Sequence, residues 1–156
     1  MLDYSVATNT WAELPALPTP RSHAAASRRE DGTFFVAGGL AEQGVLGDVY
    51  ALRLGSQTWE LRAPMPTPRA GCAYGELFGE LVCAGGDQGG AASRAVESYD
   101  PTLNEWTVLP ELPVERAGAP GAIATSRLFV IGGSPSMAFE PTSTLFELDV
   151  LATIPR

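Results

Sequence analysis

Histidine and cysteine are scarce in this sequence, which has one histidine, His23, and two cysteines, Cys72 and Cys83. A single histidine excludes any site that needs two imidazole ligands, and two cysteines are too few for a disulfide framework or a structural zinc site. No phosphate-binding loop and no Gly-x-Ser-x-Gly nucleophile elbow is present. We therefore expect no metal, no cofactor and no catalytic residue, and a binding protein rather than an enzyme.

Positive charge is also in short supply, with 10 basic against 18 acidic residues and a net charge of −8. This balance argues against binding to nucleic acid or to an anionic membrane surface. No apolar run approaches the roughly 20 residues of a membrane-spanning helix. The N-terminus lacks the basic and apolar segments of a secretory signal, so the expected location is the cytoplasm.

What the sequence does contain is a repeat with a period of about 47 residues. A tryptophan, an arginine ten residues after it and a pair of glycines recur: Trp11, Trp59 and Trp106; Arg21, Arg69 and Arg116; Gly38-Gly39, Gly85-Gly86 and Gly132-Gly133. Periods of 20–50 residues are typical of solenoids, propellers and arrays, in which one supersecondary unit is copied. The repeat therefore constrains the fold before any local pattern is considered.

Each unit contains short strand-like runs that are separated by turn residues. The second unit shows four, at 69–76, 80–84, 95–100 and around Trp106. The first unit has runs at 22–27, 33–37, 48–54 and around Trp59, and the third has runs at 118–124, 128–131 and 143–150. Four antiparallel strands per unit of this length is the layout of a propeller blade.

The pattern of Gly-Gly, a loop, 96–106 (VESYDPTLNEW), Leu-Pro and then Arg resembles the kelch repeat, over nearly the whole chain. The resemblance implies an all-β, kelch-type β-propeller segment of about three four-stranded antiparallel blades. The first unit departs from the pattern at Leu52-Arg53, and no tryptophan follows Leu148-Asp149 in the third. We assign structural roles to Gly38, Gly39, Trp59, Gly85, Gly86, Tyr99, Trp106, Gly132 and Gly133.

The expected blade boundaries leave the ring incomplete. Residues 1–19 form the outer strands of a partial blade, 20–66 the first blade, 67–113 the second, and 114–156 a third that lacks its outer strand. Propellers close with about four to eight blades. Two interpretations stay open: a fragment of a longer propeller, or a homodimer in which the strand around Trp11 completes a blade of the other copy and closes a six-bladed ring.

The repeated arginines Arg21, Arg69 and Arg116 lie where the innermost strand of each blade begins. Three convergent guanidinium groups would bind carboxylates or acidic peptides near the channel mouth. Alternatively, each arginine pairs with a nearby acid or a loop carbonyl. His23 lies two residues after Arg21, and the resemblance to kelch propellers that bind peptides makes it a candidate contact.

The two cysteines fall on adjacent strands of one hairpin. With a turn at Phe78-Gly79, Cys83 lies opposite Tyr74 and Cys72 is diagonal to it. Diagonal positions are about 7–8 Å apart, too far for an easy disulfide, so we expect two buried free thiols.

The loops after the Gly-Gly pairs differ most among the units and, by the resemblance, share one face. We name as further ligand-binding candidates Glu42, Gln43, Asp87, Gln88, Arg94 and Phe139, with Met137 and Glu140 beside them. Variable loops on a repeated scaffold are where specificity is expected. Exposed Phe139 and Met137 would be apolar anchors for a protein partner.

Three functional hypotheses follow. The first is a non-enzymatic scaffold that binds a protein or peptide through the loops on one propeller face. The second is a carbohydrate-binding propeller that resembles the kelch-type sialic acid mutarotases, with Arg21, Glu42, Asp87 and Arg94 around a sugar. The third is a truncated propeller without a function of its own.

Overall fold

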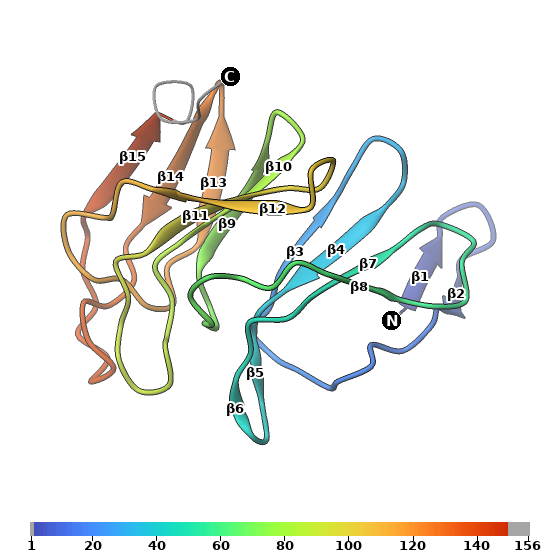
Figure 1. Cartoon of the computed structure of the whole chain (residues 1–156), viewed down its shortest axis with the longest axis horizontal. Coiled ribbons are helices and arrows are strands. Elements are labelled where there is room, and N and C mark those ends of the chain that lie inside the picture. The colour runs from blue at the N-terminus through green and yellow to red at the C-terminus, as the bar shows by residue number, and fades with distance from the viewer. Residues whose placement is uncertain (1, 150–156) are drawn as a thin grey trace.

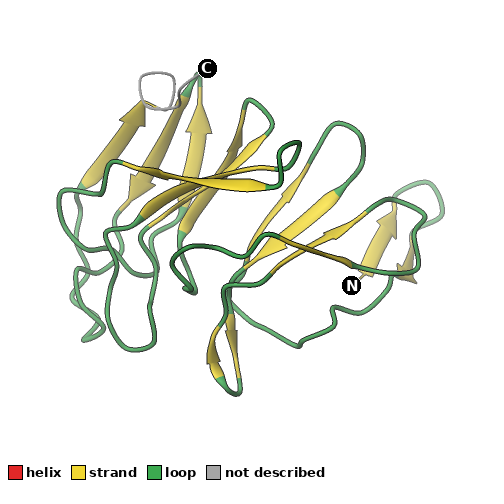
Figure 2. Cartoon of the chain, in the orientation of Figure 1, coloured by secondary structure: helices red, strands yellow, loops and turns green. Residues whose placement is uncertain are grey.

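The structure is a computed structural model that describes residues 2–149, and all regular secondary structure in that range is β-strand (Figures 1 and 2). Two four-stranded sheets and one three-stranded sheet stand side by side, and a separate hairpin flanks the first of them (Figure 1). No helix in the described range is long and apolar enough to cross a membrane.

The N-terminal hairpin and the first sheet come from the first 62 residues. The hairpin pairs β1 (Leu2–Ser5) with β2 (Thr10–Glu13). The first sheet contains, from its inner to its outer edge, β3 (Ala25–Arg28), β4 (Phe34–Ala37), β7 (Val49–Leu52) and β8 (Glu60–Arg62).

The second and third sheets repeat this order. The second contains β9 (Ala73–Leu77), β10 (Glu80–Ala84), β11 (Val96–Asp100) and β12 (Glu105–Leu109). The third contains β13 (Gly121–Ala124), β14 (Arg127–Ile131) and β15 (Leu145–Asp149). Neighbouring strands in each sheet are antiparallel, and Cys83 lies opposite Tyr74, as the turn at Phe78-Gly79 predicts.

The inner strands begin later than the runs at 22–27, 69–76 and 118–124 predict. β3, β9 and β13 start at Ala25, Ala73 and Gly121 because the residue two or three positions earlier has a positive φ: 55° at His23, 59° at Gly71 and 63° at Gly118. A left-handed residue cannot continue an extended strand.

The other strand bounds differ from the predicted ones in detail. β7 ends at Leu52 rather than residue 54, and β8 begins just after Trp59. The loop at 40–47 contains a small hairpin, β5 (Leu40–Ala41) with β6 (Gly44–Val45), that the repeat pattern does not reveal. The predicted end of the third unit, 150–156, lies outside the described residues.

Neighbouring sheets pack against each other through two hydrophobic clusters, one on each face of the second sheet. Side chains alternate faces along a strand, so Leu81 packs toward Phe35 of the first sheet and Val82 toward Leu128 of the third. Tyr99, fully buried, packs between Phe35 and Trp106 with ring centroids 5.9 and 5.2 Å away. Each unit therefore uses its neighbours to complete its own core.

The tryptophans tie each unit to the segment before it. The indole N–H of Trp59 donates to the carbonyl of Pro15 at 3.1 Å, and that of Trp106 donates to the carbonyl of Ala63 at 2.9 Å. Trp11, on β2, is 65% exposed.

Candidate functional site

The three repeated arginines turn into the sheets. Arg21 donates to both carboxylate oxygens of Asp48 at 2.9 Å, and its side chain is 1% exposed. Arg69 donates to Glu97 at 2.8 Å and to a backbone carbonyl, with both charged side chains at or below 1% exposure. Burying both charges removes them from water at a cost in free energy, and the additional hydrogen bonds of Arg69 offset part of that cost.

The third arginine, Arg116, has no acidic partner of this kind among the residues that the structure describes. It donates to the hydroxyl of Thr144 and to the carbonyl of Glu115, and its guanidinium lies 4.8 Å from the ring centre of Phe146. Arg116 is 3% exposed. All three guanidinium groups are thus engaged within the fold, and a role for them in ligand binding stays a prediction.

The Arg21 contact also sets the protonation of its partner. Burial by itself raises the pKa of Asp48, but the hydrogen bonds and the charge of Arg21 outweigh that effect. The pKa of the Asp48 carboxyl therefore lies below its ordinary value, and the ion pair persists into mildly acidic solution.

The cysteines are likewise internal. Cys72 and Cys83 are buried free thiols, as the sequence predicts. The hydrogen bond with Cys72, and then burial, raise the pKa of the Cys83 thiol well above its ordinary value.

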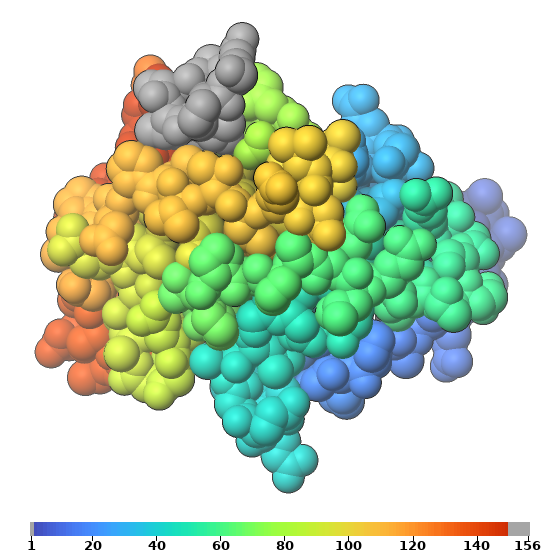
Figure 3. Space-filling model, in the orientation of Figure 1, coloured from blue at the N-terminus to red at the C-terminus, as the bar shows by residue number. Residues whose placement is uncertain are grey.

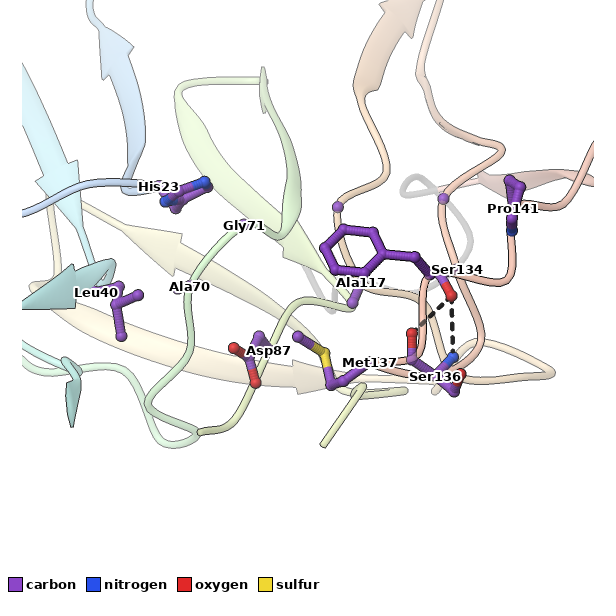
Figure 4. Close-up of a pocket in the computed structure, with 13 residues that line it drawn as sticks. His23, Leu40, Ala70, Gly71, Asp87, Ala117, Ser134, Ser136, Met137 and Pro141 are labelled. Carbon is purple, nitrogen blue, oxygen red and sulfur yellow. Dashed lines mark hydrogen bonds between the residues drawn. The ribbon is translucent and has the colours of Figure 1, made fainter. Parts of the chain in front are cut away.

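A cavity of about 520 Å³ lies at the end of the sheets where the inner strands begin (Figure 4). All three units contribute to it. Its lining contains His23, Leu40, Ala70, Gly71, Asp87, Ala117, Gly118, Gly133, Ser134, Ser136, Met137, Phe139 and Pro141. Sites of this size are typical of ligand-binding clefts.

The first set of lining residues directly follows the Gly-Gly pairs. Leu40, Asp87 and Ser134 occupy this position in the first, second and third units. Each is held by two backbone hydrogen bonds to the residue after its own repeated arginine. For Asp87 these bonds measure 2.7 and 2.9 Å, to Ala70. The scaffold thus presents three different side chains from one repeated backbone position.

The second set consists of the left-handed residues that precede the inner strands. Gly71 and Gly118 have this conformation, and a Cβ atom built on either would meet nothing within 4 Å. His23 occupies the same position in the first unit, with φ of 55°. Its Nδ1 lies 3.0 Å from the hydroxyl of Ser22. The first unit therefore places a side chain where the other two leave open space.

The loop at 134–142 forms one wall of the cavity. The Ser134 hydroxyl donates to the carbonyl of Ser136 at 2.6 Å and accepts the Ser136 amide at 3.3 Å (Figure 4). It also accepts the amide of Glu140 at 3.0 Å. These bonds present Met137, 38% exposed, and Phe139, 89% exposed. Phe139 has φ of 53°, which is a genuine outlier for a bulky side chain. Strained backbone conformations of this kind cluster at active sites and ligand-binding sites.

Asp87 is the one acidic residue of the described cavity lining. Its Oδ1 accepts the amides of Gly89 and Gly90 at 2.9 and 2.7 Å. Its Oδ2 receives no hydrogen bond, and Asp87 makes no ion pair, among residues 2–149. A turn thus fixes the carboxylate while leaving one oxygen available.

The remaining predicted residues lie outside the lining. Glu42 and Gln43 form the tip of the β5–β6 hairpin, which projects from the lower edge of the molecule (Figure 3). Arg94 donates to the carbonyl of Leu112 at 2.8 Å and lies 3.6 Å from Glu111. The backbone amide of Gln88 donates to the carbonyl of Ala91 in the loop beyond Asp87.

The structure therefore brings together His23, Asp87, Met137 and Phe139 among the predicted residues. Sequence reasoning missed Leu40 and Ser134 as individual residues. The signal was present, because both stand where Asp87 stands in its own unit, directly after a repeated glycine pair.

Comparison with known proteins places these features in context. Residues 68–113 match the family model for the Kelch motif. Human "Kelch-like protein 33" is 32% identical over 132 residues, which are 82% of this chain and 25% of that protein. "Kelch domain-containing protein 8B" of Mus musculus is 33% identical over 153 residues, 88% of this chain and 43% of that protein.

A plant protein and a solved structure extend the comparison. "F-box protein AFR" of Arabidopsis thaliana is 29% identical over 154 residues, 92% of this chain and 41% of that protein. The chain thus spans less than half the length of these relatives. The solved structure named "Structure of YjhT" superposes on 92% of this chain and 47% of its own, with a TM-score of 0.78 at 20% identity. That likeness concerns the fold, and it confirms the expected all-β arrangement of propeller type.

Proposed function

Because this chain belongs to the kelch repeat family, we propose that it is a non-enzymatic scaffold that binds a protein or peptide through the cavity at the loop end of its sheets. The kelch-like and F-box relatives support a role in protein interaction. The observation that carries the proposal is the cavity itself, where three units present unlike side chains from equivalent backbone positions.

The four residues of the carbohydrate hypothesis do not meet. Asp87 lines the cavity, whereas Arg21 is paired with Asp48, Arg94 binds Leu112 and Glu42 lies on the projecting hairpin. Sugar recognition needs several convergent polar groups, so no observation favours this second function over peptide binding.

The proposal is tested by selecting heptapeptides from a phage-displayed library on the purified chain and measuring the affinity of a synthetic binder by fluorescence polarisation. Phe139→Ala should weaken binding by about tenfold or more, because exposed aromatic anchors dominate such interfaces. Phe78→Ala is the matched control, since Phe78 is also exposed and has φ of 54° but lies outside the lining. Equal affinity of the two variants would contradict the proposed site.

We also propose that two copies associate through the open edges of the array. The second glycine of a pair donates to the carbonyl of the next unit's arginine: Gly39 to Arg69 at 3.0 Å and Gly86 to Arg116 at 2.6 Å. Among residues 2–149 the amide of Gly133 and the carbonyl of Arg21 have no such partner. The free amide at one edge and the free carbonyl at the other are complementary, and β2 and β15 are exposed or edge strands. Both features favour pairing of these edges with a second copy of the chain.

A further inference from the structure

The cavity also indicates the chemistry of what it binds. We propose that its occupant is a peptide segment in which a bulky apolar side chain stands next to a basic one. The apolar side chain packs on Leu40, Met137 and Phe139, and the basic group pairs with Oδ2 of Asp87. This inference rests on the proposed function and adds the class of ligand.

The composition of the lining favours an apolar side chain on the ligand. Leu40 is 39% exposed, Met137 38% and Phe139 89%, which leaves three large apolar surfaces open around one cavity. Between them the walls are built from small residues such as Ala70 and Ala117, so the space of about 520 Å³ stays open. Burial of apolar surface is the main source of affinity in such a site.

The hydroxyl groups of the lining are already satisfied, which disfavours a ligand rich in hydroxyls. Ser134 donates to Ser136 and accepts amides of its own loop. The Ser136 hydroxyl donates to Glu140 at 3.2 Å and accepts the amide of Ala138 at 3.2 Å. Apart from one remaining acceptor site on the Ser136 hydroxyl, a sugar would have to break these bonds in order to hydrogen-bond with either serine.

Asp87 favours a basic group on the ligand. It is the only carboxylate of the described lining, and no arginine contributes to the cavity wall. Its free Oδ2 is held in place by the turn that binds Oδ1, so a cation gains a fixed partner. The net charge of −8 adds a long-range attraction for the same sign of ligand. An acidic peptide would be repelled both by the net charge of the chain and by the Asp87 carboxylate.

The experiment selects heptapeptides from a phage-displayed random library on the whole chain and synthesises the best binder twice. One copy is as selected, and the other has its basic residue replaced by glutamine. The wild-type protein should prefer the selected peptide by about tenfold, which corresponds to about 1.4 kcal/mol. Asp87→Asn should reduce that preference to less than about twofold, because asparagine still accepts the Gly89 and Gly90 amides but carries no charge.

The outcomes separate the two proposals. Selected peptides that are acidic, or that lack a basic residue beside the apolar one, would uphold peptide binding but overturn this inference. Retention of the tenfold preference by Asp87→Asn would overturn it as well. Failure to select any binder would contradict both. Thermal midpoints of Asp87→Asn and the wild type should agree, which establishes that the variant is folded.

Discussion

At the scale of residues, conformation separates side chains that fold the chain from side chains that face its cavity. Asn9, Phe78, Asn104 and Thr125 have positive φ at hairpin turns, where the geometry of the turn itself requires such values. His23 and Phe139 have it outside the hairpin turns, in longer loop segments, and both line the cavity. A left-handed conformation costs a non-glycine residue about 1–2 kcal/mol. The chain therefore gives up some stability at two positions that line the cavity.

Glycine occupies the position of His23 in the other two units. Replacing His23 by glycine tests whether this residue lowers stability while contributing to ligand binding. The free energy of unfolding should rise by about 0.5–1 kcal/mol, because glycine adopts the left-handed conformation without steric cost, although it loses more entropy on folding. Affinity for the selected heptapeptide should fall at the same time. Urea denaturation and fluorescence polarisation measure the two effects.

His23→Asn serves as the comparison, since asparagine tolerates the left-handed region and keeps a polar side chain. It should be at least as stable as the wild type and retain more affinity than His23→Gly. If His23→Gly is instead less stable than the wild type, the residue supports the fold rather than the site.

At the scale of elements, the glycine pairs determine how neighbouring sheets meet. A Cβ atom at Gly38 would lie 2.5 Å from the carbonyl oxygen of Arg69, and one at Gly85 would lie 2.5 Å from that of Arg116. Both are backbone atoms of the next unit, so neither can move aside without a shift of that unit's main chain. Close approach of two sheets therefore explains why glycine repeats here.

Gly38→Ala and Gly71→Ala isolate this effect, because the two glycines have φ of 61° and 59°. Gly71→Ala should cost about 1 kcal/mol, the penalty of the backbone conformation alone, since nothing lies within 4 Å of its Cβ position. Gly38→Ala should cost more than about 3 kcal/mol, because the clash with Arg69 is added. Urea denaturation midpoints provide the measurement, and equal losses would show that the close approach is unimportant.

The recurrence of whole elements made much of the fold predictable from the sequence. The repeat predicted the four-stranded units and the Phe78-Gly79 turn, because glycines, tryptophans and alternating strands recur at fixed offsets. The start of each inner strand was not predictable, since the left-handed residue before it is glycine in two units and histidine in the third. His23, Asp87 and Phe139 stood out as chemically unusual. Leu40 did not, because its equivalence to Asp87 becomes visible only when the units are aligned on their glycine pairs.

At the scale of the whole molecule, the array is open at both edges within residues 2–149. Trp59 and Trp106 each bind a carbonyl of the preceding unit, while Trp11 is 65% exposed. Leu145, on the edge strand β15, is 55% exposed. Unpaired strand edges with exposed apolar residues favour association with further strands.

Self-association predicts a molar mass in solution of twice the 16.4 kDa of one chain. Light scattering on a gel-filtered sample measures it directly. Trp11→Glu should convert the species to single chains, because a charge would then have to be buried at the edge that the second copy covers. A monomeric wild type would contradict the proposed association and leave the cavity proposal untouched.

The equivalence of Leu40, Asp87 and Ser134 has a consequence for how such a protein diversifies. Each of these side chains projects from a backbone position that is fixed by its own pair of main-chain hydrogen bonds, whatever side chain stands there. The packing that joins the sheets resides elsewhere, in the glycine pairs, the tryptophans and the buried arginines. The residues that contact a ligand and the residues that hold the sheets together therefore occupy different positions of the same repeat. Duplication or exchange of a single unit would replace one wall of the cavity at a time and create a new ligand preference without a new fold.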